Sequence, residues 1–351
     1  MLLYRLLLKS RAKAWRKAPH AEVPTICVGN ITVGGTGKTP HTEMILDMLQ
    51  QHYKWGSANL AVLSRGYKRR SRGFQQVMTD STAAFAGDEP LQIKRKFPAV
   101  TVAVDKDRVE GCSFLVHPDK LQEPVKKLRR IRDKQFPPAG LIVLDDAFQY
   151  NKLHADLNIV LVDYNRPLNT DRLLPFGRLR DLPERIADAD VVIVTKCPYE
   201  LDDWERTVWA GNLGLRKDQT LLFSCIEYLD PVPVFPETDS RYSYSKSLVL
   251  FTGIANDTPL RYSLSDKYRI VEAISFPDHH KFSRADMTKV ASAVRRHPTA
   301  ALFTTEKDAG RVLDCRKIPA EIKQRLFHVP IRVRFLTDRE RELFEERLSR
   351  L

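Results

Sequence analysis

The chain has 351 residues, 43% of them hydrophobic, which is enough for two globular domains. Its 57 Lys and Arg outnumber its 44 Asp and Glu, and the formal net charge of +13 favours anionic partners such as nucleotides, phospholipids or nucleic acid. The five cysteines are scattered without a C-x-x-C pair, and no apolar run reaches the ~20 residues of a transmembrane helix. The composition therefore argues against a disulfide framework, a cysteine zinc site and a membrane-spanning protein, and it fits a reducing cytosolic setting.

The N-terminus combines leucines with basic residues. Leu2, Leu3, Leu6 and Leu7 fall on one face of a predicted helix, and six bases precede the first acid, Glu22. A helix lying on anionic lipid has this pattern. A helix docked on its own domain shows a similar leucine strip, so both interpretations stay open.

From residue 25 onward, apolar runs alternate with helical patterns. A strand at 25–28 precedes a glycine-rich loop and an amphipathic helix, and further strands are predicted at 60–63, 100–104, 141–144, 159–162 and 191–194. Their continuous apolarity is typical of a parallel sheet covered on both faces. The sequence thus predicts an α/β domain over residues 1–226.

The segment 227–245 is rich in Pro, Ser and Tyr and is predicted to be a linker. A second, smaller α/β domain is expected over residues 246–351, with strands at 248–251, 269–276, 300–304 and 327–333. Ser283 and Asp286 form a capping box that predicts a helix from Arg284. The basic stretch 126–134 is predicted to be a solvated helix face.

A glycine-rich turn joins the first strand of the first domain to its helix: Gly34-Gly35-Thr36-Gly37-Lys38-Thr39. Such a P-loop directs backbone N–H groups at phosphate oxygens. We expect Lys38 to reach the β- and γ-phosphates of a nucleotide and Thr39 to hold Mg²⁺. The usual pattern has a glycine where this chain has Thr32, so Gly34 and Gly35 would supply the flexibility.

Two acids complete the predicted phosphate site. Asp145 and Asp146 follow the apolar strand 141–144 directly, where P-loop proteins place a magnesium ligand. Gln149 lies one helical turn further and is expected to orient phosphate or water. A turn or a helix cap would also explain the acids.

Together these motifs resemble the tetraacyldisaccharide 4′-kinases, the lipid A 4′-kinases of Gram-negative bacteria. The matching blocks are VGNITVGGTGKTP at 28–40, SRGY at 64–67, GDEP at 87–90, DDAFQ at 145–149, LPFG at 174–177, DH at 278–279 and TEKD at 305–308. The family also lacks the first P-loop glycine. The fold implied is a P-loop NTPase-like, mostly parallel sheet covered by helices, with a smaller C-terminal α/β domain.

The resemblance implies transfer of the γ-phosphoryl group of ATP to the 4′-hydroxyl of a tetraacylated glucosamine disaccharide 1-phosphate. Mg²⁺ would be required, and the chain would act peripherally at the cytoplasmic face of the bacterial inner membrane. The expected partners are ATP, an anionic glycolipid and a membrane surface, with no nucleic acid or protein partner. The family usually has a longer hydrophobic leader than residues 1–24, which predicts a late start or a shortened anchor.

The resemblance also implies roles for single residues. Asp88 and His279 match the family's catalytic pair, which would require the two predicted domains to close over the substrate. The expected substrate residues are Glu89, Arg65, Arg108 and Arg178. Asp145, Asp146 and Thr39 would serve the metal, and the P-loop with Gln149 would serve ATP.

Two other classes of protein share some of these features. A switch ATPase or GTPase acting on a protein or metal partner would share the P-loop and the sheet. Thr195-Lys196-Cys197-Pro198 lacks the final aspartate of the guanine-reading Asn-Lys-x-Asp motif, which argues against a GTPase and leaves Lys196 to cover a purine. A nucleic-acid module lacks aromatic residues among its arginines.

Overall fold

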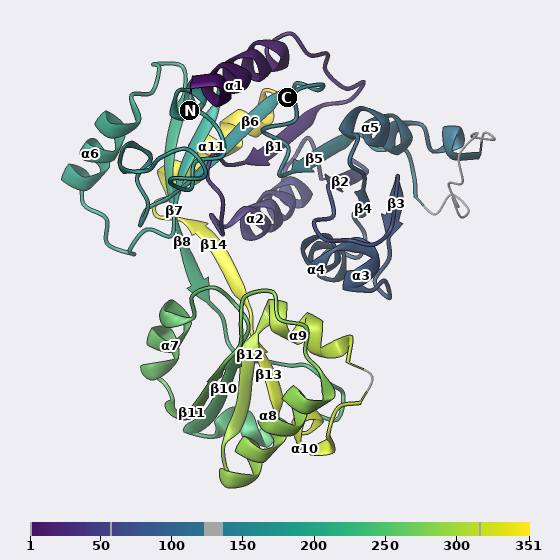
Figure 1. The fold of residues 1–351 in the computed structure, drawn as a ribbon, viewed down its shortest axis with the longest axis vertical. Coiled ribbons are helices and arrows are strands. Elements are labelled where there is room, and N and C mark those ends of the chain that lie inside the picture. Colours follow the sequence, from purple (N-terminus) through teal and green to yellow (C-terminus); the bar gives the residue numbers. More distant parts are fainter. Residues whose placement is uncertain (1, 57, 123–135, 316) are drawn as a thin grey trace. The chain divides into compact units, whose positions relative to one another are not determined.

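The computed structural model describes residues 2–56, 58–122, 136–315 and 317–351 and divides into two compact units (Figure 1). Unit 1 comprises Met1–Ile226 and Val333–Leu351, and unit 2 comprises Glu227–Arg332. The basic stretch 126–134 lies outside the described residues. In the described part of the chain, no helix is both long and apolar enough to cross a bilayer.

Unit 1 is built on a nine-stranded sheet, counted over the described residues, in the order β14-β8-β7-β6-β1-β5-β2-β4-β3. The strands are β1 (Thr25–Gly29), β2 (Leu60–Ser64), β3 (Gln75–Val77), β4 (Thr101–Val104), β5 (Leu141–Asp145), β6 (Leu157–Asp163), β7 (Val191–Thr195), β8 (Thr220–Tyr228) and β14 (Ile331–Phe335). The pairings from β8 through β4 are parallel, and β3 is antiparallel to β4. The predicted P-loop NTPase-like sheet is confirmed.

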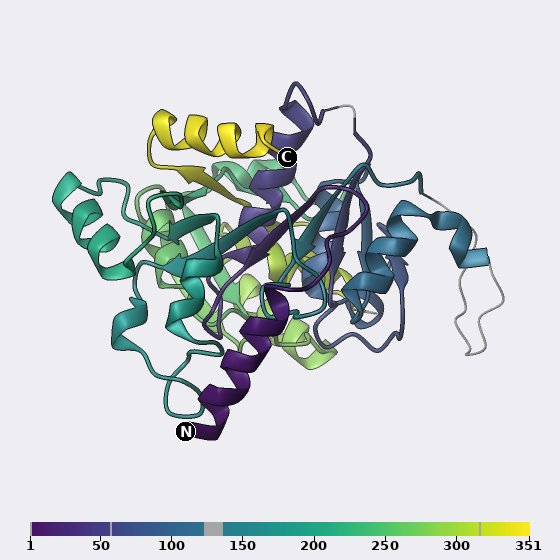
Figure 2. The same ribbon diagram turned by 90° about the horizontal axis from the view of Figure 1, so that it is seen from above.

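Helices cover both faces of this sheet. One face packs against α1 (Leu2–Trp15), α5 (Arg108–Val116) and α6 (Asp203–Leu213). The other packs against α2 (Lys38–Gln51), α4 (Asp88–Lys96) and α11 (Asp338–Ser349). Figure 2 shows α1 and α11 on opposite sides of the sheet. Within β1, Cys27 faces one cluster while Ile26 and Val28 face the other, so the continuous apolarity of the strand follows from burial on both faces.

Shorter helical segments of unit 1 lie in its connections. They are α3 (Ala83–Ala86) and the 3₁₀ turns at Pro118–Gln122, Leu168–Thr170 and Pro183–Asp188.

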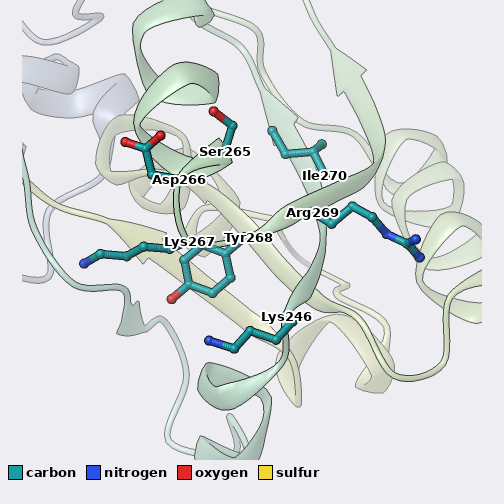
Figure 3. A pocket seen from close by; sticks show the side chains of 7 residues that line it. All are labelled: Lys246, Ser265, Asp266, Lys267, Tyr268, Arg269 and Ile270. Carbon is teal, nitrogen blue, oxygen red and sulfur yellow. The ribbon is translucent and has the colours of Figure 1, made fainter.

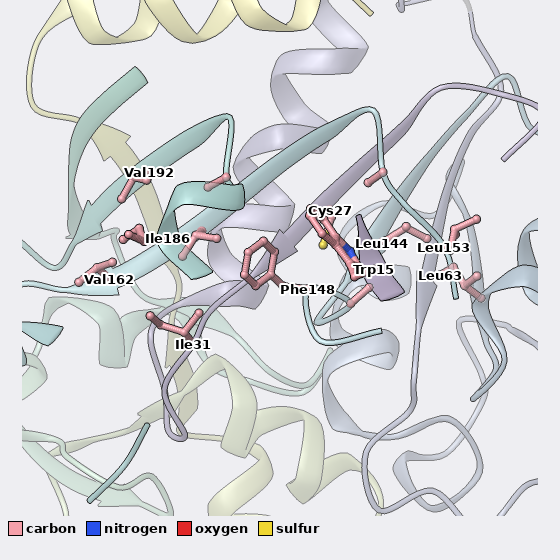
Figure 4. Packing of buried hydrophobic residues seen from close by; sticks show 14 of the residues in the cluster. Trp15, Cys27, Ile31, Leu63, Leu144, Phe148, Leu153, Val162, Ile186 and Val192 are labelled. Atoms are coloured by element: carbon pink, nitrogen blue, oxygen red, sulfur yellow. The ribbon is translucent and has the colours of Figure 1, made fainter. Parts of the chain in front are cut away.

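The N-terminal helix α1 docks on unit 1. Leu8, Ala12 and Trp15 are buried at helical spacing, and Trp15 packs near Cys27 and Phe148 (Figure 4). Leu6 and Leu7, which were assigned to the leucine strip, remain 56% and 52% exposed. The helix therefore docks through one face and leaves leucines on another.

Unit 2 has a five-stranded sheet over the described residues, in the order β11-β10-β12-β13-β9. The strands are β9 (Val232–Pro233), β10 (Ser247–Thr252), β11 (Arg269–Ser275), β12 (Ala301–Thr305) and β13 (Leu326–Val329), and the helical segments are α7 (Thr258–Ser265), α8 (Arg284–Arg296), α9 (Glu306–Leu313), α10 (Ala320–Lys323) and a 3₁₀ turn at Ser240–Tyr244. The predicted capping box is confirmed, because Ser283 and Asp286 exchange hydrogen bonds at the start of α8.

The predicted domain boundaries differ from the structure in two places. The segment 227–245 is part of unit 2: it contains β9, which pairs with β13, and Thr238, whose hydroxyl donates to the Lys323 carbonyl. The predicted strand 327–333 is two strands separated by Pro330. The second, β14, joins the nine-stranded sheet, and the chain from Val333 through α11 belongs to unit 1. Proline lacks the N–H needed to continue a ladder, and it separates two strands that join different sheets.

Candidate nucleotide and phosphoryl-transfer site

The C-terminal ends of the parallel strands form one edge of the unit 1 sheet. The P-loop follows β1, and its neighbour β5 ends at Asp145. On the other side β1 pairs with β6, which ends at Asp163 and pairs with β7, followed by Lys196. Ligands of α/β proteins bind at this edge.

The conformation of the P-loop explains its unusual sequence. Thr32 forms an isolated antiparallel bridge to Leu179, so this position is extended and needs no glycine. The left-handed positions are Gly34, with φ of 110°, and Gly37, with φ of 91°. Gly37 directly precedes the first residue of α2, Lys38. The N–H groups of a helix start thus lie where the sequence predicted phosphate binding.

Asn30 anchors the beginning of the P-loop. Its buried side chain donates to the Thr36 hydroxyl at 2.8 Å and accepts from Arg180. The Gln149 amide donates to the Asn30 carbonyl at 2.6 Å, and Arg180 reaches the same oxygen at 3.2 Å. Gln149 therefore contacts the start of the predicted phosphate loop, and its predicted role toward phosphate or water stays a prediction.

Asp146 is held by two cations. The guanidinium of Arg180 donates to both carboxylate oxygens, and the Lys38 ammonium lies 3.8 Å from one of them. Burial favours the protonated form, but the Arg180 hydrogen bonds and the charge of Lys38 hold the pKa of Asp146 below its usual value. Both close charge partners of Asp146, Arg180 and Lys38, are therefore cations of the protein itself.

Asp145 has a different environment. It is buried, and one oxygen accepts from the Ser64 hydroxyl at 3.0 Å while the other has no hydrogen-bond partner. Burial, followed by the charges of Glu89 and Asp146, raises the pKa of Asp145 to about 7. A buried carboxylate oxygen without a partner fits a cation ligand.

Asp88 and Glu89 occupy the first turn of α4, where the helix dipole favours negative charge. The turn that follows β2 packs closely against the residues just before α4, because a Cβ at Gly66 would lie 2.7 Å from the Ala86 carbonyl. Arg70 also donates its N–H to the Ala84 carbonyl. The SRGY and GDEP motifs, distant in sequence, thereby form adjacent loops.

The predicted arginines occupy different settings. Arg65 is exposed beside the SRGY turn, whereas Arg108 is buried and donates to the carbonyls of Asp105 and Lys106. The Arg178 side chain is exposed, while its carbonyl accepts from Val33 of the P-loop. Sequence reasoning missed Arg180, for which the only signal is its place three residues after the LPFG block.

In unit 2, His279 adopts a left-handed φ of 60°, and its Nδ1 lies 3.2 Å from the Arg311 guanidinium. An arginine only donates, so Nδ1 accepts and a neutral ring carries its proton on Nε2. Asp308 of the TEKD motif is buried, accepts from Arg311 at 2.9 Å and also accepts from the Gly253 N–H. Asp308 of the TEKD motif therefore holds Arg311, and Arg311 in turn contacts His279. His280 instead stacks on Phe276.

A pocket of about 550 Å³ in unit 2 lies apart from these residues. It is formed by Lys246 and by residues 265–270, from the end of α7 to the start of β11 (Figure 3). None of the predicted site residues lines it.

The sheet, the P-loop and the acidic strand end define a protein of the P-loop NTPase-like class. A family model described as tetraacyldisaccharide-1-P 4′-kinase matches residues 1–350, and the chain belongs to this family. The resemblance inferred from the motifs is thus confirmed, and with it the assignment as an ATP-dependent kinase. The alternative of a switch ATPase or GTPase is not favoured.

Individual relatives agree with this assignment. The tetraacyldisaccharide 4′-kinase of Parabacteroides distasonis is 39% identical over 331 residues, which cover 92% of this chain and 84% of that protein. The enzyme of the same name from Flavobacterium johnsoniae is 34% identical over 347 residues, covering 97% and 92%. The crystal structure of "apo" form LpxK from Aquifex aeolicus in complex with ATP matches with a TM-score of 0.71 and 24% identity over 99% of this chain and 96% of that one. It confirms the fold.

Proposed function

We propose that the chain transfers the γ-phosphoryl group of ATP to the 4′-hydroxyl of a tetraacylated glucosamine disaccharide 1-phosphate, a precursor of lipid A. The observation that carries this proposal is the placement of Lys38 in a member of this kinase family. Lys38 begins the helix that follows β1, and its ammonium lies 3.8 Å from Asp146, directly after Asp145 at the end of the adjacent strand β5. Lys38 would bind the β- and γ-phosphates. The N–H groups at the start of α2 would bind them as well.

Mg²⁺ would be held by the buried hydroxyl of Thr39 and by Asp145. Support comes from the unpartnered oxygen of Asp145 and from the engagement of Asp146 by Arg180. No group of three His, Cys, Asp or Glu side chains able to hold a metal occurs among the described residues, so phosphate oxygens and water would complete the shell. When bound, the ion neutralises charge on the phosphates.

Asp88 would position the acceptor hydroxyl. Phosphoryl transfer passes through a loose transition state with little charge on the attacking oxygen, so orientation matters more than early proton removal. Arg65, Arg108, Arg178 and Glu89 would surround the acceptor end of the site. The partnership of Asp88 with His279 stays a prediction.

The decisive experiment incubates purified protein with γ-labelled Mg-ATP and the tetraacyl disaccharide 1-phosphate. We expect label in the lipid, and we expect Lys38→Ala to reduce transfer by 10²-fold or more, on the order found when a transition-state donor is removed. Label recovered only as free phosphate would instead favour the switch ATPase. Transfer by Lys38→Ala at the wild-type rate would contradict the P-loop assignment.

We further propose that the chain acts at an anionic membrane surface. Support comes from Leu6 and Leu7, which are exposed on α1, and from the exposed Lys9 and Lys13 on the face of Leu6. The acylated substrate would reside in the same membrane.

A further inference from the structure

Three successive carbonyl groups of the P-loop accept hydrogen bonds from side chains. The Gly35 carbonyl accepts from the Lys196 ammonium, the Thr36 carbonyl accepts from the Thr195 hydroxyl at 2.9 Å, and the Gly37 carbonyl accepts from His41 Nδ1 at 2.7 Å. We call the three side chains of Thr195, Lys196 and His41 the carbonyl brace. Two come from the end of β7 and one from the first turn of α2.

The peptide group explains why these contacts matter. In a planar trans peptide the C=O and the following N–H point in opposite directions, so a side chain that fixes one oxygen also fixes the next N–H. Through the Gly35 carbonyl the brace fixes the Thr36 N–H, which donates to the Gly34 carbonyl at 3.1 Å inside the turn. Through the Thr36 and Gly37 carbonyls it sets the direction of the N–H groups of Gly37 and Lys38. These N–H groups belong to the loop and helix start that the proposed function assigns to phosphate.

Each member of the brace is itself held in place. Lys196 forms an ion pair of 2.6 Å with Asp163 at the end of β6. Thr195 is fully buried. The Lys196 ammonium thus contacts Asp163 and the Gly35 carbonyl, and the purine-covering role expected for this side chain from the sequence stays a prediction.

His41 is fixed by a second partner. Its Nε2 lies 2.9 Å from the Ser224 hydroxyl on β8, and the ring is buried. A carbonyl only accepts, so Nδ1 carries the proton and Nε2 accepts from Ser224. Burial, together with the charge of Lys196, lowers the pKa of His41 to about 4, although its hydrogen bond to Gly37 opposes this shift, so the ring is neutral at physiological pH. In this single tautomer, the His41 side chain connects α2 to β8.

We infer that the carbonyl brace preorganises the P-loop for the triphosphate of ATP, so that Thr195, Lys196 and His41 are positioning residues of the kinase. The inference rests on the proposed function, because it assumes that the loop binds ATP. A loop already held in its bound conformation loses less entropy on binding. Loss of a brace contact should therefore weaken ATP binding and leave the acceptor site unchanged.

The test compares two variants of one residue. Thr195→Ser keeps the hydroxyl, whereas Thr195→Val keeps the shape and removes it. We expect Thr195→Val to raise the Kd of a fluorescent ATP analogue and the KM for ATP about tenfold, the size of one hydrogen bond. The KM for the lipid should stay within about twofold, and Thr195→Ser should resemble the wild type.

A second pair and a control separate positioning from loss of stability. His41→Asn keeps a donor near the Gly37 carbonyl, and we expect it to bind ATP more tightly than His41→Leu. Thr25→Val removes a buried hydroxyl that donates to Asp156 at the opposite end of β1, and it should lower stability without changing the affinity for ATP.

The measurements distinguish failure of the carbonyl brace from failure of the proposed function. Equal ATP affinities for Thr195→Val and Thr195→Ser, or a loss of affinity in Thr25→Val as large as in Thr195→Val, would overturn the inference. Wild-type protein that bound ATP without phosphorylating the lipid would contradict the proposed function, while the brace would still be judged from ATP affinity.

Discussion

Two adjacent carboxylates of the site have opposite electrostatic environments. The Arg180 hydrogen bonds and Lys38 overcome the burial of Asp146 and lower its pKa, whereas burial raises the pKa of Asp145 to about 7. Pairs whose environments separate their pKa values commonly divide their roles. The proposed function accordingly gives Asp145 to the metal, whereas Asp146 is held by Arg180 and Lys38.

The first prediction concerns pH and Asp145→Asn. A folded-state pKa of about 7 lies above the ordinary value of 3.8, so the folded chain must retain a proton that the unfolded chain releases. Ionisation of Asp145 therefore destabilises the metal-free protein as the pH rises from about 4 to about 7, and the penalty is constant above that range. We expect Asp145→Asn to increase the free energy of unfolding by about 4 kcal/mol at pH 8 and by about 1.5 kcal/mol at pH 5, because one pKa unit corresponds to about 1.4 kcal/mol.

Urea unfolding of the metal-free protein at both pH values measures this difference. Asp190→Asn serves as a control at the N-terminal end of β7, away from the proposed metal. A gain for Asp145→Asn that did not depend on pH would contradict the assigned ionisation.

The second prediction concerns Arg180, which joins Asn30 to Asp146. Lysine would keep the charge but lose the planar fork that donates to two groups at once. We expect Arg180→Lys to lower kcat/KM for ATP about 10- to 100-fold, because Asp146 and the P-loop would lose their common donor. Steady-state kinetics check this, with Arg172→Lys, at an exposed arginine outside the proposed site, as the matched variant. Equal effects of the two substitutions would contradict the role given to Arg180.

At the scale of elements, α1 presents one face to the core and another to solvent. Leu8 is 4% exposed, whereas Leu6 is 56% exposed. The third prediction is that Leu6→Ser combined with Leu7→Ser weakens binding to anionic vesicles at least about tenfold, since the loss of only two buried methylenes, at about 0.8 kcal/mol each, already has this effect. The melting temperature should change little because both residues are already exposed.

Vesicle sedimentation checks the third prediction, and Leu8→Ala provides the contrast. That substitution should cost about 2–5 kcal/mol of stability because it leaves a cavity under the helix. Vesicle binding that was unchanged by the double substitution would remove the support for α1 as the membrane contact.

Sequence reasoning located the elements whose burial or helix start produces a local pattern of residue types. The strands β1, β5 and β7 carry uninterrupted apolar runs because both faces are covered, and α8 begins at its capping box. No such local pattern shows which strands pair with each other. The strand β14 alternates Ile331, Val333 and Phe335 with arginines, which predicts a strand but not the sheet that it joins.

In the candidate site too, residues in local motifs were predicted and residues that act through distant partners were not. The P-loop and Asp145 were predicted because their chemistry depends on short motifs. Arg180 and His41 were missed because their roles depend on Asn30 and Ser224, which lie far from them in sequence. Hydrogen-bond partners across a fold leave no local pattern.

At the scale of the whole molecule, unit 2 is an insertion between two neighbouring strands of unit 1. The chain leaves the nine-stranded sheet along β8 and returns to it along β14. The two residues predicted to act together are therefore divided, with Asp88 in unit 1 and His279 in unit 2. Each is supported within its own unit, Asp88 by the start of α4 and His279 by Arg311.

The fourth prediction is a double-mutant cycle on these residues. If Asp88 and His279 act as one group on the acceptor hydroxyl, each alanine variant should lower kcat about 10²- to 10⁴-fold, and the double variant should be little worse than either. The Kd for ATP should be unchanged in all three, because the P-loop and its contacts are intact. His280→Asn is the matched control, since the ring of His280 packs on Phe276 and lies 3.0 Å from Asp286. If the losses in kcat multiply in the double variant, the two residues act independently. If His280→Asn lowers kcat as much as His279→Ala, the loss comes from the fold of the loop. Only non-additive losses confined to Asp88 and His279 therefore support the catalytic pair.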